Sequence, residues 1–148
     1  MRFRDSGPGL AQGPIAFAAV NGDSWVLPRS PLLVAVVEDE ESVRKALGRL
    51  LRSAALGVDA YASGEEFLRT LPGRMPDCLL LDLQLPGMNG LAVLSRLRES
   101  NFRLPVVFIT ATGNLAECKQ ATLSGATAWL QKPVDDRVLL ETIAQALQ

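Results

Sequence analysis

The fold is decided by the stretch Cys78-Leu79-Leu80-Leu81-Asp82-Leu83-Gln84-Leu85-Pro86-Gly87-Met88-Asn89-Gly90. Its first four residues are apolar without polar alternation, which is typical of a strand buried on both faces. Asp82 ends this run, and the Pro, Gly and Asn residues that follow indicate a loop. A helical pattern then continues to about residue 98. A buried strand, a loop and a helix in this order form one β-α unit of a parallel sheet.

The same order of apolar run and amphipathic stretch repeats on both sides of this unit. The expected strands cover residues 32–37, 58–61, 78–81, 106–109 and 128–131. The expected helices cover about 42–54, 63–71, 91–98, 115–124 and 135–147, and Ser63 with Glu66 forms a capping-box pattern. Five β-α units predict an α/β fold, a doubly wound parallel sheet in a three-layer sandwich with helices on both faces.

Composition limits the class of protein. The chain has 148 residues, of which 48% are apolar and 21% charged, a balance typical of one soluble globular domain. Residues 1–30 are rich in Gly, Pro and Ala and are predicted to be a flexible N-terminal extension, and residues 31–148 form the domain. The N-terminus is a poor signal peptide and no apolar run reaches the ~18 residues of a membrane span, so we expect a cytoplasmic protein.

Several kinds of site are excluded by residue content. The chain contains no histidine, which removes zinc sites and catalytic triads that depend on imidazole. A net charge of -1 offers no positive field for nucleic-acid phosphates, so direct nucleic-acid binding is not expected. Cys78 and Cys118 lie far apart and are interpreted as buried apolar residues in a reducing compartment.

Polar side chains follow four of the five expected strands. Glu38 and Asp39 follow the first strand, and Asp82, Thr110 and Lys132 follow the third, fourth and fifth. Ligands of open parallel sheets bind beyond the carboxyl ends of the strands, so one site is implied. Three converging carboxylates repel one another unless a cation lies between them. Oxygen ligands and a small number of carboxylates favour Mg²⁺.

A carboxylate beside a metal, a lysine and a threonine could accept a phosphoryl group or act as a base in metal-assisted hydrolysis. The arrangement favours acceptance by Asp82, because an ionised carboxylate forms an acyl phosphate by direct attack. The charge on the transferred group would then be stabilised by Mg²⁺, the Lys132 ammonium and the Thr110 hydroxyl.

Four motifs carry a family resemblance: Val36-Val37-Glu38-Asp39-Glu40, Leu80 to Gly90, Ile109-Thr110-Ala111 and Lys132-Pro133. Together they resemble the receiver domains of bacterial two-component response regulators, over Leu32 to Gln148. The resemblance implies a flavodoxin-like fold with strand order 2-1-3-4-5, and phosphorylation of Asp82 by a sensor histidine kinase. It also implies Mg²⁺ binding by Glu38, Asp39, Asp82 and the backbone carbonyl of Gln84. A cis peptide before Pro133 would direct Lys132 into the site.

The resemblance further implies how the signal is passed on. Thr110 would move toward the phosphoryl group and Trp129 would turn inward; alternatively, Trp129 only packs against the fourth helix. Gln84 and Thr112 would tune the attack of water on the phosphorylated form. A downstream protein would bind the face formed by the fourth helix, the fifth strand and the fifth helix, and phosphorylation-dependent homodimerisation is a further expected outcome.

Several functions stay open at this point. The chain could be a stand-alone receiver, a phosphorelay intermediate or the receiver of a longer regulator. A pseudo-receiver is disfavoured by the intact set Asp39, Asp82, Thr110 and Lys132. A related Mg²⁺-dependent hydrolase would need a second acid-base carboxylate next to its nucleophile, where Leu83 and Gln84 stand instead. We therefore expect a signalling phosphoacceptor that catalyses its own phosphotransfer and dephosphorylation, and not an enzyme.

Overall fold

Strands and helices alternate along most of the chain. The computed structural model describes residues 19–20, 24–25, 32–111 and 114–148. From residue 32 the elements are β3 (Leu33–Val37), α1 (Glu41–Ser53), β4 (Gly57–Tyr61), α2 (Gly64–Arg69), β5 (Cys78–Asp82), α3 (Gly90–Glu99), β6 (Val106–Thr110), α4 (Leu115–Leu123), β7 (Ala128–Gln131) and α5 (Asp136–Ala146). Each predicted element is present, with ends that differ from the prediction by at most two residues.

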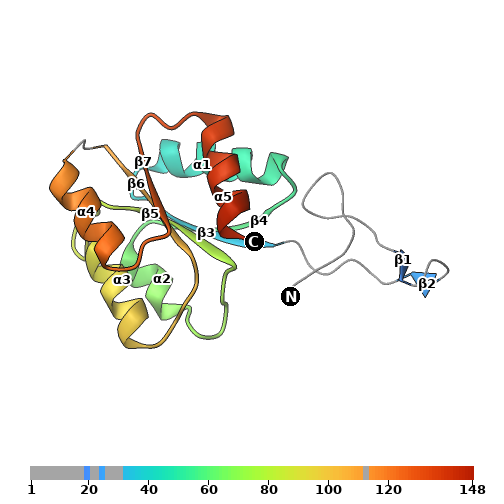
Figure 1. The fold of residues 1–148 in the computed structure, drawn as a ribbon, viewed down its shortest axis with the longest axis horizontal. Helices are drawn as coiled ribbons and strands as arrows, with labels where there is room; N and C mark the ends of the chain where they lie inside the picture. Colours follow the sequence, from blue (N-terminus) through green and yellow to red (C-terminus); the bar gives the residue numbers. More distant parts are fainter. Residues whose placement is uncertain (1–18, 21–23, 26–31, 112–113) are drawn as a thin grey trace.

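The five strands from β3 to β7 form one parallel sheet in the order β4-β3-β5-β6-β7. Counted from β3, this is the predicted order 2-1-3-4-5. Helices α1 and α5 cover one face of the sheet, and α2, α3 and α4 cover the other (Figure 1). The predicted doubly wound, flavodoxin-like three-layer sandwich is therefore confirmed.

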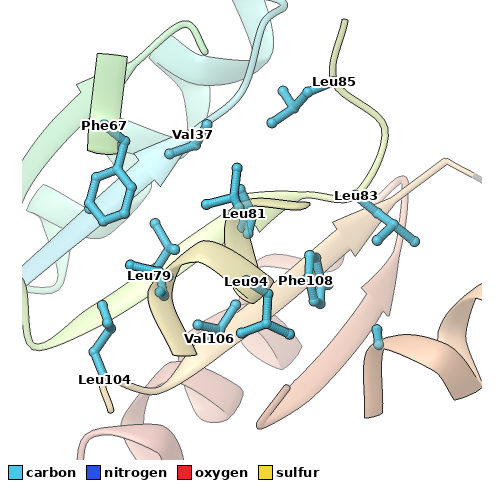
Figure 2. Packing of buried hydrophobic residues seen from close by; sticks show 14 residues of the cluster. Val37, Phe67, Leu79, Leu81, Leu83, Leu85, Leu94, Leu104, Val106 and Phe108 are labelled. Atoms are coloured by element: carbon cyan, nitrogen blue, oxygen red, sulfur yellow. The ribbon is translucent and has the colours of Figure 1, made fainter. Parts of the chain in front are cut away.

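The core lies on both faces of the central strands. Every residue of β5 and β6 is buried, which explains why their sequences lack polar alternation. On the face of α2 and α3, Phe67, Leu81 and Phe108 belong to one apolar cluster (Figure 2). On the face of α1 and α5, Leu51 and Ile143 belong to a second cluster. The strand ends thus project from a rigid, densely packed centre.

Residues 1–30 lie mostly outside the described ranges. The exceptions are β1 (Ala19–Val20) and β2 (Ser24–Trp25), which pair in antiparallel fashion. The sequence shows no strand period there, so this short pair was not predicted. Among the described residues, no helix has the length and apolar character needed to cross a membrane.

The two cysteines follow the prediction. Cys78 and Cys118 are both free and buried. Burial raises the pKa of the Cys78 thiol to about 12, so this group stays protonated near neutral pH. Both residues act as small apolar side chains, as the sequence indicates.

The loop after β5 is fixed to the strand by tight packing at Gly90. Its N–H donates to the carbonyl of Leu83 over 3.0 Å, and Asn89 caps α3 by accepting from the N–H of Ala92 over 2.9 Å. A Cβ atom at position 90 would lie 2.6 Å from the carbonyl oxygen of Asp82 and 2.8 Å from the Phe108 ring. Only glycine fits between the start of α3 and the end of β5.

We predict that Gly90→Ala destabilises the protein by about 1–3 kcal/mol, because backbone or ring atoms must shift to admit the methyl group. Urea unfolding followed by circular dichroism measures this change. Gly48→Ala is the matched control: its Cβ would meet only the flexible end of Arg52, at 3.1 Å, and alanine favours the helix by about 1 kcal/mol. Equal stability of Gly90→Ala and wild type would show that this packing is not tight.

Candidate functional site

The register of the sheet places the predicted site residues at one edge. Val37 pairs with Leu81, so Glu38 and Asp82 follow at the same level. Thr110 pairs with Gln131, so Lys132 follows directly beyond it. Because parallel strands all end on the same side, four separate segments of the chain meet here.

Three carboxylates form an acidic cluster at this edge. Glu38, Asp39 and Asp82 each offer an oxygen, and these oxygens lie within 4.8 Å of one another. Glu38 is 1% and Asp82 3% exposed, whereas Asp39 is exposed. Together with Glu40, Gln84, Ala111 and Lys132 they line a pocket of about 450 Å³.

Glu38 is held by hydrogen bonds at both carboxylate oxygens. Oε1 accepts from the ammonium of Lys132 over 2.7 Å, and Oε2 accepts from the N–H of Glu40 over 3.0 Å. Burial raises the pKa of Glu38, and the hydrogen bond from Lys132 opposes this shift. Lys132 therefore supplies this buried carboxyl group with a positively charged hydrogen-bond partner.

Lys132 also contacts the second buried carboxylate. Its ammonium lies 3.3 Å from Oδ2 of Asp82, and its backbone N–H donates to the carbonyl of Thr110 over 2.7 Å. Burial lowers the pKa of Lys132, but the hydrogen bond to Glu38 and the charge of Asp82 outweigh it, so the net pKa is raised. The peptide bond between Lys132 and Pro133 is cis. Lys132 thus lies between the two buried carboxyl groups as their shared hydrogen-bond partner.

Asp82 is fixed at the end of β5 by contacts to both oxygens. Oδ1 accepts from the N–H of Gln84 over 3.0 Å, and Oδ2 faces Lys132. The side chain of Gln84 is exposed at the pocket wall. Asp82 is therefore held in one orientation while its oxygens line the pocket.

The two predicted switch residues lie on neighbouring strands. Thr110 is fully buried at the end of β6. Trp129 pairs with Phe108 and packs, half-buried, against the apolar cluster on the face of α2, α3 and α4. Thr112, predicted to tune dephosphorylation, lies outside the described residues.

Two polar contacts at this site were not predicted from the sequence. Arg44 of α1 donates from Nη1 to the carbonyl of Glu38 over 2.8 Å. Glu65 in the first turn of α2 accepts from the N–H of Met88 over 3.3 Å and thus supports the loop after β5. Neither residue belongs to a motif at a strand end, so no sequence signal marks it.

The donor set fits Mg²⁺. All candidate ligands are oxygens, one carboxylate is exposed and two are buried, and a pocket opens above them. Mg²⁺ commonly uses one or two carboxylates and keeps several waters, which such an open pocket allows. Glu38, Asp39 and Asp82 are therefore the residues that could hold the ion.

Comparison with known proteins agrees with this geometry. The family model of the response regulator receiver domain matches residues 34–144. The chain belongs to the response-regulator receiver family. Receivers take part in two-component signalling, where they interact with histidine kinases and downstream effectors, and they bind Mg²⁺ at an acidic pocket. This receiver has an acidic cluster formed by Glu38, Asp39 and Asp82.

Individual relatives show how far the similarity extends. This receiver is 37% identical over 116 residues to nodulation protein W of Bradyrhizobium diazoefficiens, covering 78% of the chain and 51% of that protein. It is 39% identical over 103 residues to the DNA-binding transcriptional regulator NtrC of Escherichia coli K12, covering 70% and 22%. The chain thus spans about half or less of the length of these relatives.

This chain matches two solved receiver structures over nearly the whole length of those structures. A response regulator receiver protein from Burkholderia phymatum matches with a TM-score of 0.70 and 42% identity, covering 78% of this chain and 94% of that one. The crystal structure of FixJ-N matches with a TM-score of 0.74 and 33% identity, covering 78% and 92%. The similarity therefore comprises one receiver domain.

We predict that Lys132→Met lowers the free energy of unfolding by about 1.5–3 kcal/mol at neutral pH without divalent ions, because two buried carboxylates lose a charged hydrogen-bond partner. The loss should shrink as the pH falls, since the pair requires ionised Glu38, and burial makes this group take up a proton above its usual pKa of 4.5. Urea unfolding at several pH values measures both effects.

Lys45→Met provides the control for this substitution. Lys45 pairs with Glu41 over 3.0 Å, but both side chains are more than 60% exposed. Exposed pairs of this kind contribute less than about 1 kcal/mol. An equally small effect for both substitutions would contradict the stabilising role of Lys132.

Proposed function

We propose that this receiver accepts a phosphoryl group on Asp82 from a histidine kinase in a Mg²⁺-dependent reaction and then changes its surface to signal to a partner protein. The observation that supports this best is the environment of Asp82. Its carboxylate is oriented by Gln84, neutralised by Lys132 and accompanied by two further carboxylates within 4.8 Å. A lone structural aspartate would not need this arrangement.

Asp82 is the proposed nucleophile. One of its carboxylate oxygens forms a bond to phosphorus while the bond between phosphorus and the donor's leaving atom breaks. No separate base is required, because the carboxylate itself is the nucleophile and the Lys132 ammonium lies beside it. Asp39 and Asp82, with Glu38 beside them and the backbone carbonyl of Gln84, would hold Mg²⁺, which neutralises charge on the phosphoryl oxygens when bound.

Lys132 and Thr110 are proposed to stabilise the transferred group. The Lys132 ammonium lies 3.3 Å from Asp82 and can move from the carboxylate to a phosphoryl oxygen without leaving the pocket. Thr110 ends β6 at the same edge, so its hydroxyl can contact another phosphoryl oxygen. Gln84, whose side chain is exposed at the pocket wall, and Thr112 are proposed to govern the access of water.

Helix α4, strand β7 and helix α5 form the proposed output face. Leu115 and Leu123 of α4 are 74% and 75% exposed, an apolar surface that a downstream protein or a second copy of the chain could cover. Trp129 of β7 lies between this face and the core. Movement of Thr110 toward the phosphoryl group would allow Trp129 to turn inward and reshape the face.

Other parts of the proposal rest on the sequence. Residues 31–148 act as the receiver and residues 1–30 as an N-terminal extension, in a cytoplasmic protein that binds Mg²⁺. The chain acts as a signalling phosphoacceptor and not as an enzyme on other substrates, and it does not contact nucleic acid directly, because its net charge is -1.

We predict that incubation with a small phosphodonor and Mg²⁺ produces an acid-stable, base-labile acyl phosphate on Asp82. Intact-mass spectrometry should show the added mass of one phosphoryl group only when Mg²⁺ is present. Asp82→Asn should abolish the adduct, because its amide is a poor nucleophile. Asp59→Asn, which changes an aspartate outside the pocket, is the control and should phosphorylate normally. Adduct formation in Asp82→Asn, or none in wild type, would refute the proposal.

We further predict that phosphodonor and Mg²⁺ together change the fluorescence of Trp129, because the indole moves between half-buried and buried positions. The measurement uses Trp25→Phe, so that Trp129 is the remaining tryptophan among the two in the chain. The Trp25→Phe, Asp82→Asn double variant is the control and should show no change. A constant signal in phosphorylated Trp25→Phe would leave Trp129 with a packing role only.

A further inference from the structure

The turn between β3 and α1 carries two of the three carboxylates of the acidic cluster. Glu38 is anchored by its side chain and by its N–H, which donates to the carbonyl of Tyr61 over 3.1 Å. Asp39 differs, because its side chain is exposed. Packing therefore does little to orient the carboxylate of Asp39, and its direction depends on the backbone of the turn.

Arg44 reaches back from the first turns of α1 to this backbone. Its Nη1 donates to the carbonyl of Glu38 over 2.8 Å and lies 3.4 Å from the carbonyl of Asp39. These two carbonyls belong to the peptide groups immediately before and after the Cα atom of Asp39. Holding both groups fixes the two backbone dihedrals of Asp39 and hence the direction of its Cα–Cβ bond.

The positive charge of Arg44 and its contact with the turn should have opposite effects on Mg²⁺ binding. A guanidinium close to a cation site repels the ion, so by charge alone Arg44 weakens Mg²⁺ binding. The contact with the two carbonyls acts in the opposite direction, because a preoriented carboxylate binds the ion without an ordering cost. The two effects predict opposite signs when Arg44 is replaced.

We infer that Arg44 is a positioning residue for the metal site: it holds the turn so that the Asp39 carboxylate faces Asp82. This inference rests on the proposed Mg²⁺-dependent function of the same site. It assigns to α1 a contribution to metal affinity that the carboxylates alone do not supply. The positioning contact then outweighs the repulsion between the guanidinium and the ion.

The test compares Arg44→Met with Lys45→Met by calorimetric titration with Mg²⁺ at constant ionic strength. Both substitutions remove one positive charge from the same part of α1, and methionine retains an unbranched stem that favours helix. Lys45 pairs with Glu41 instead of the turn. We expect roughly tenfold weaker Mg²⁺ binding for Arg44→Met, as for other groups that orient metal ligands, and unchanged or slightly tighter binding for Lys45→Met.

A second readout separates positioning from a general loss of stability. The Mg²⁺ concentration for half-maximal phosphorylation of Asp82 should rise roughly tenfold in Arg44→Met, while the rate at saturating Mg²⁺ stays within about twofold of wild type. Arg44→Lys, which keeps the charge and one donor group, should recover part of the affinity. If circular dichroism shows that Arg44→Met does not fold, Arg44→Lys takes its place in the comparison with Lys45→Met. The inference then requires Arg44→Lys to bind Mg²⁺ more weakly than Lys45→Met does.

The outcomes distinguish this inference from the function on which it rests. Mg²⁺ binding in Arg44→Met that is as tight as in wild type, or tighter, would overturn the positioning role and leave the proposed function intact. Wild-type protein that binds no Mg²⁺ and forms no adduct would overturn both.

Discussion

The ammonium group of Lys132 is the counter-charge that allows two carboxylates to lie buried at one edge of the sheet. It lies 2.7 Å from Glu38 and 3.3 Å from Asp82, both almost fully buried. Buried anions without a partner cost several kcal/mol, so the site depends on this pairing when no metal is bound. In the proposed function, the same ammonium would contact the phosphoryl group once Asp82 carries it. Lys132 would then serve both the stability of the resting site and the chemistry of the reacting site.

The central strands β5 and β6 and the outer strand β7 differ in how tightly they are packed. Strands β5 and β6 are fully buried and deliver Asp82 and Thr110 in fixed positions. Strand β7 is only half-buried, and the adjacent α4 exposes large apolar side chains. Few buried contacts permit movement at low cost, so a change at the buried site can be expressed at this outer face. On the proposed function, the receiver fold would place the chemistry in its most rigid part and the output surface beside its least packed part.

Much of this arrangement was predictable from the sequence, because a parallel sheet brings all strand ends to one edge. Apolar runs located the strands, and the polar residues after them identified Glu38, Asp39, Asp82 and Lys132 as neighbours. The contact of Arg44 with the turn was not predictable, since it depends on the path of a long side chain back along α1. The lack of room for a side chain at Gly90 was not predictable for a similar reason. It results from the close approach of the start of α3 to the end of β5. The short β1-β2 pair lacks any hydrophobic period that would have marked it.

The central claim is that one edge of the sheet assembles a metal-dependent phosphoacceptor around Asp82. A crystal structure of the protein with Mg²⁺ and beryllofluoride, a stable mimic of a phosphoryl group, tests it most directly. Our account requires the beryllium to be bonded to a carboxylate oxygen of Asp82, with its fluorine atoms in contact with Lys132 and Thr110. It also requires the ion to lie among Glu38, Asp39, Asp82 and the backbone carbonyl of Gln84. An unmodified Asp82 with Mg²⁺ bound elsewhere, under conditions that saturate other receivers, would contradict it.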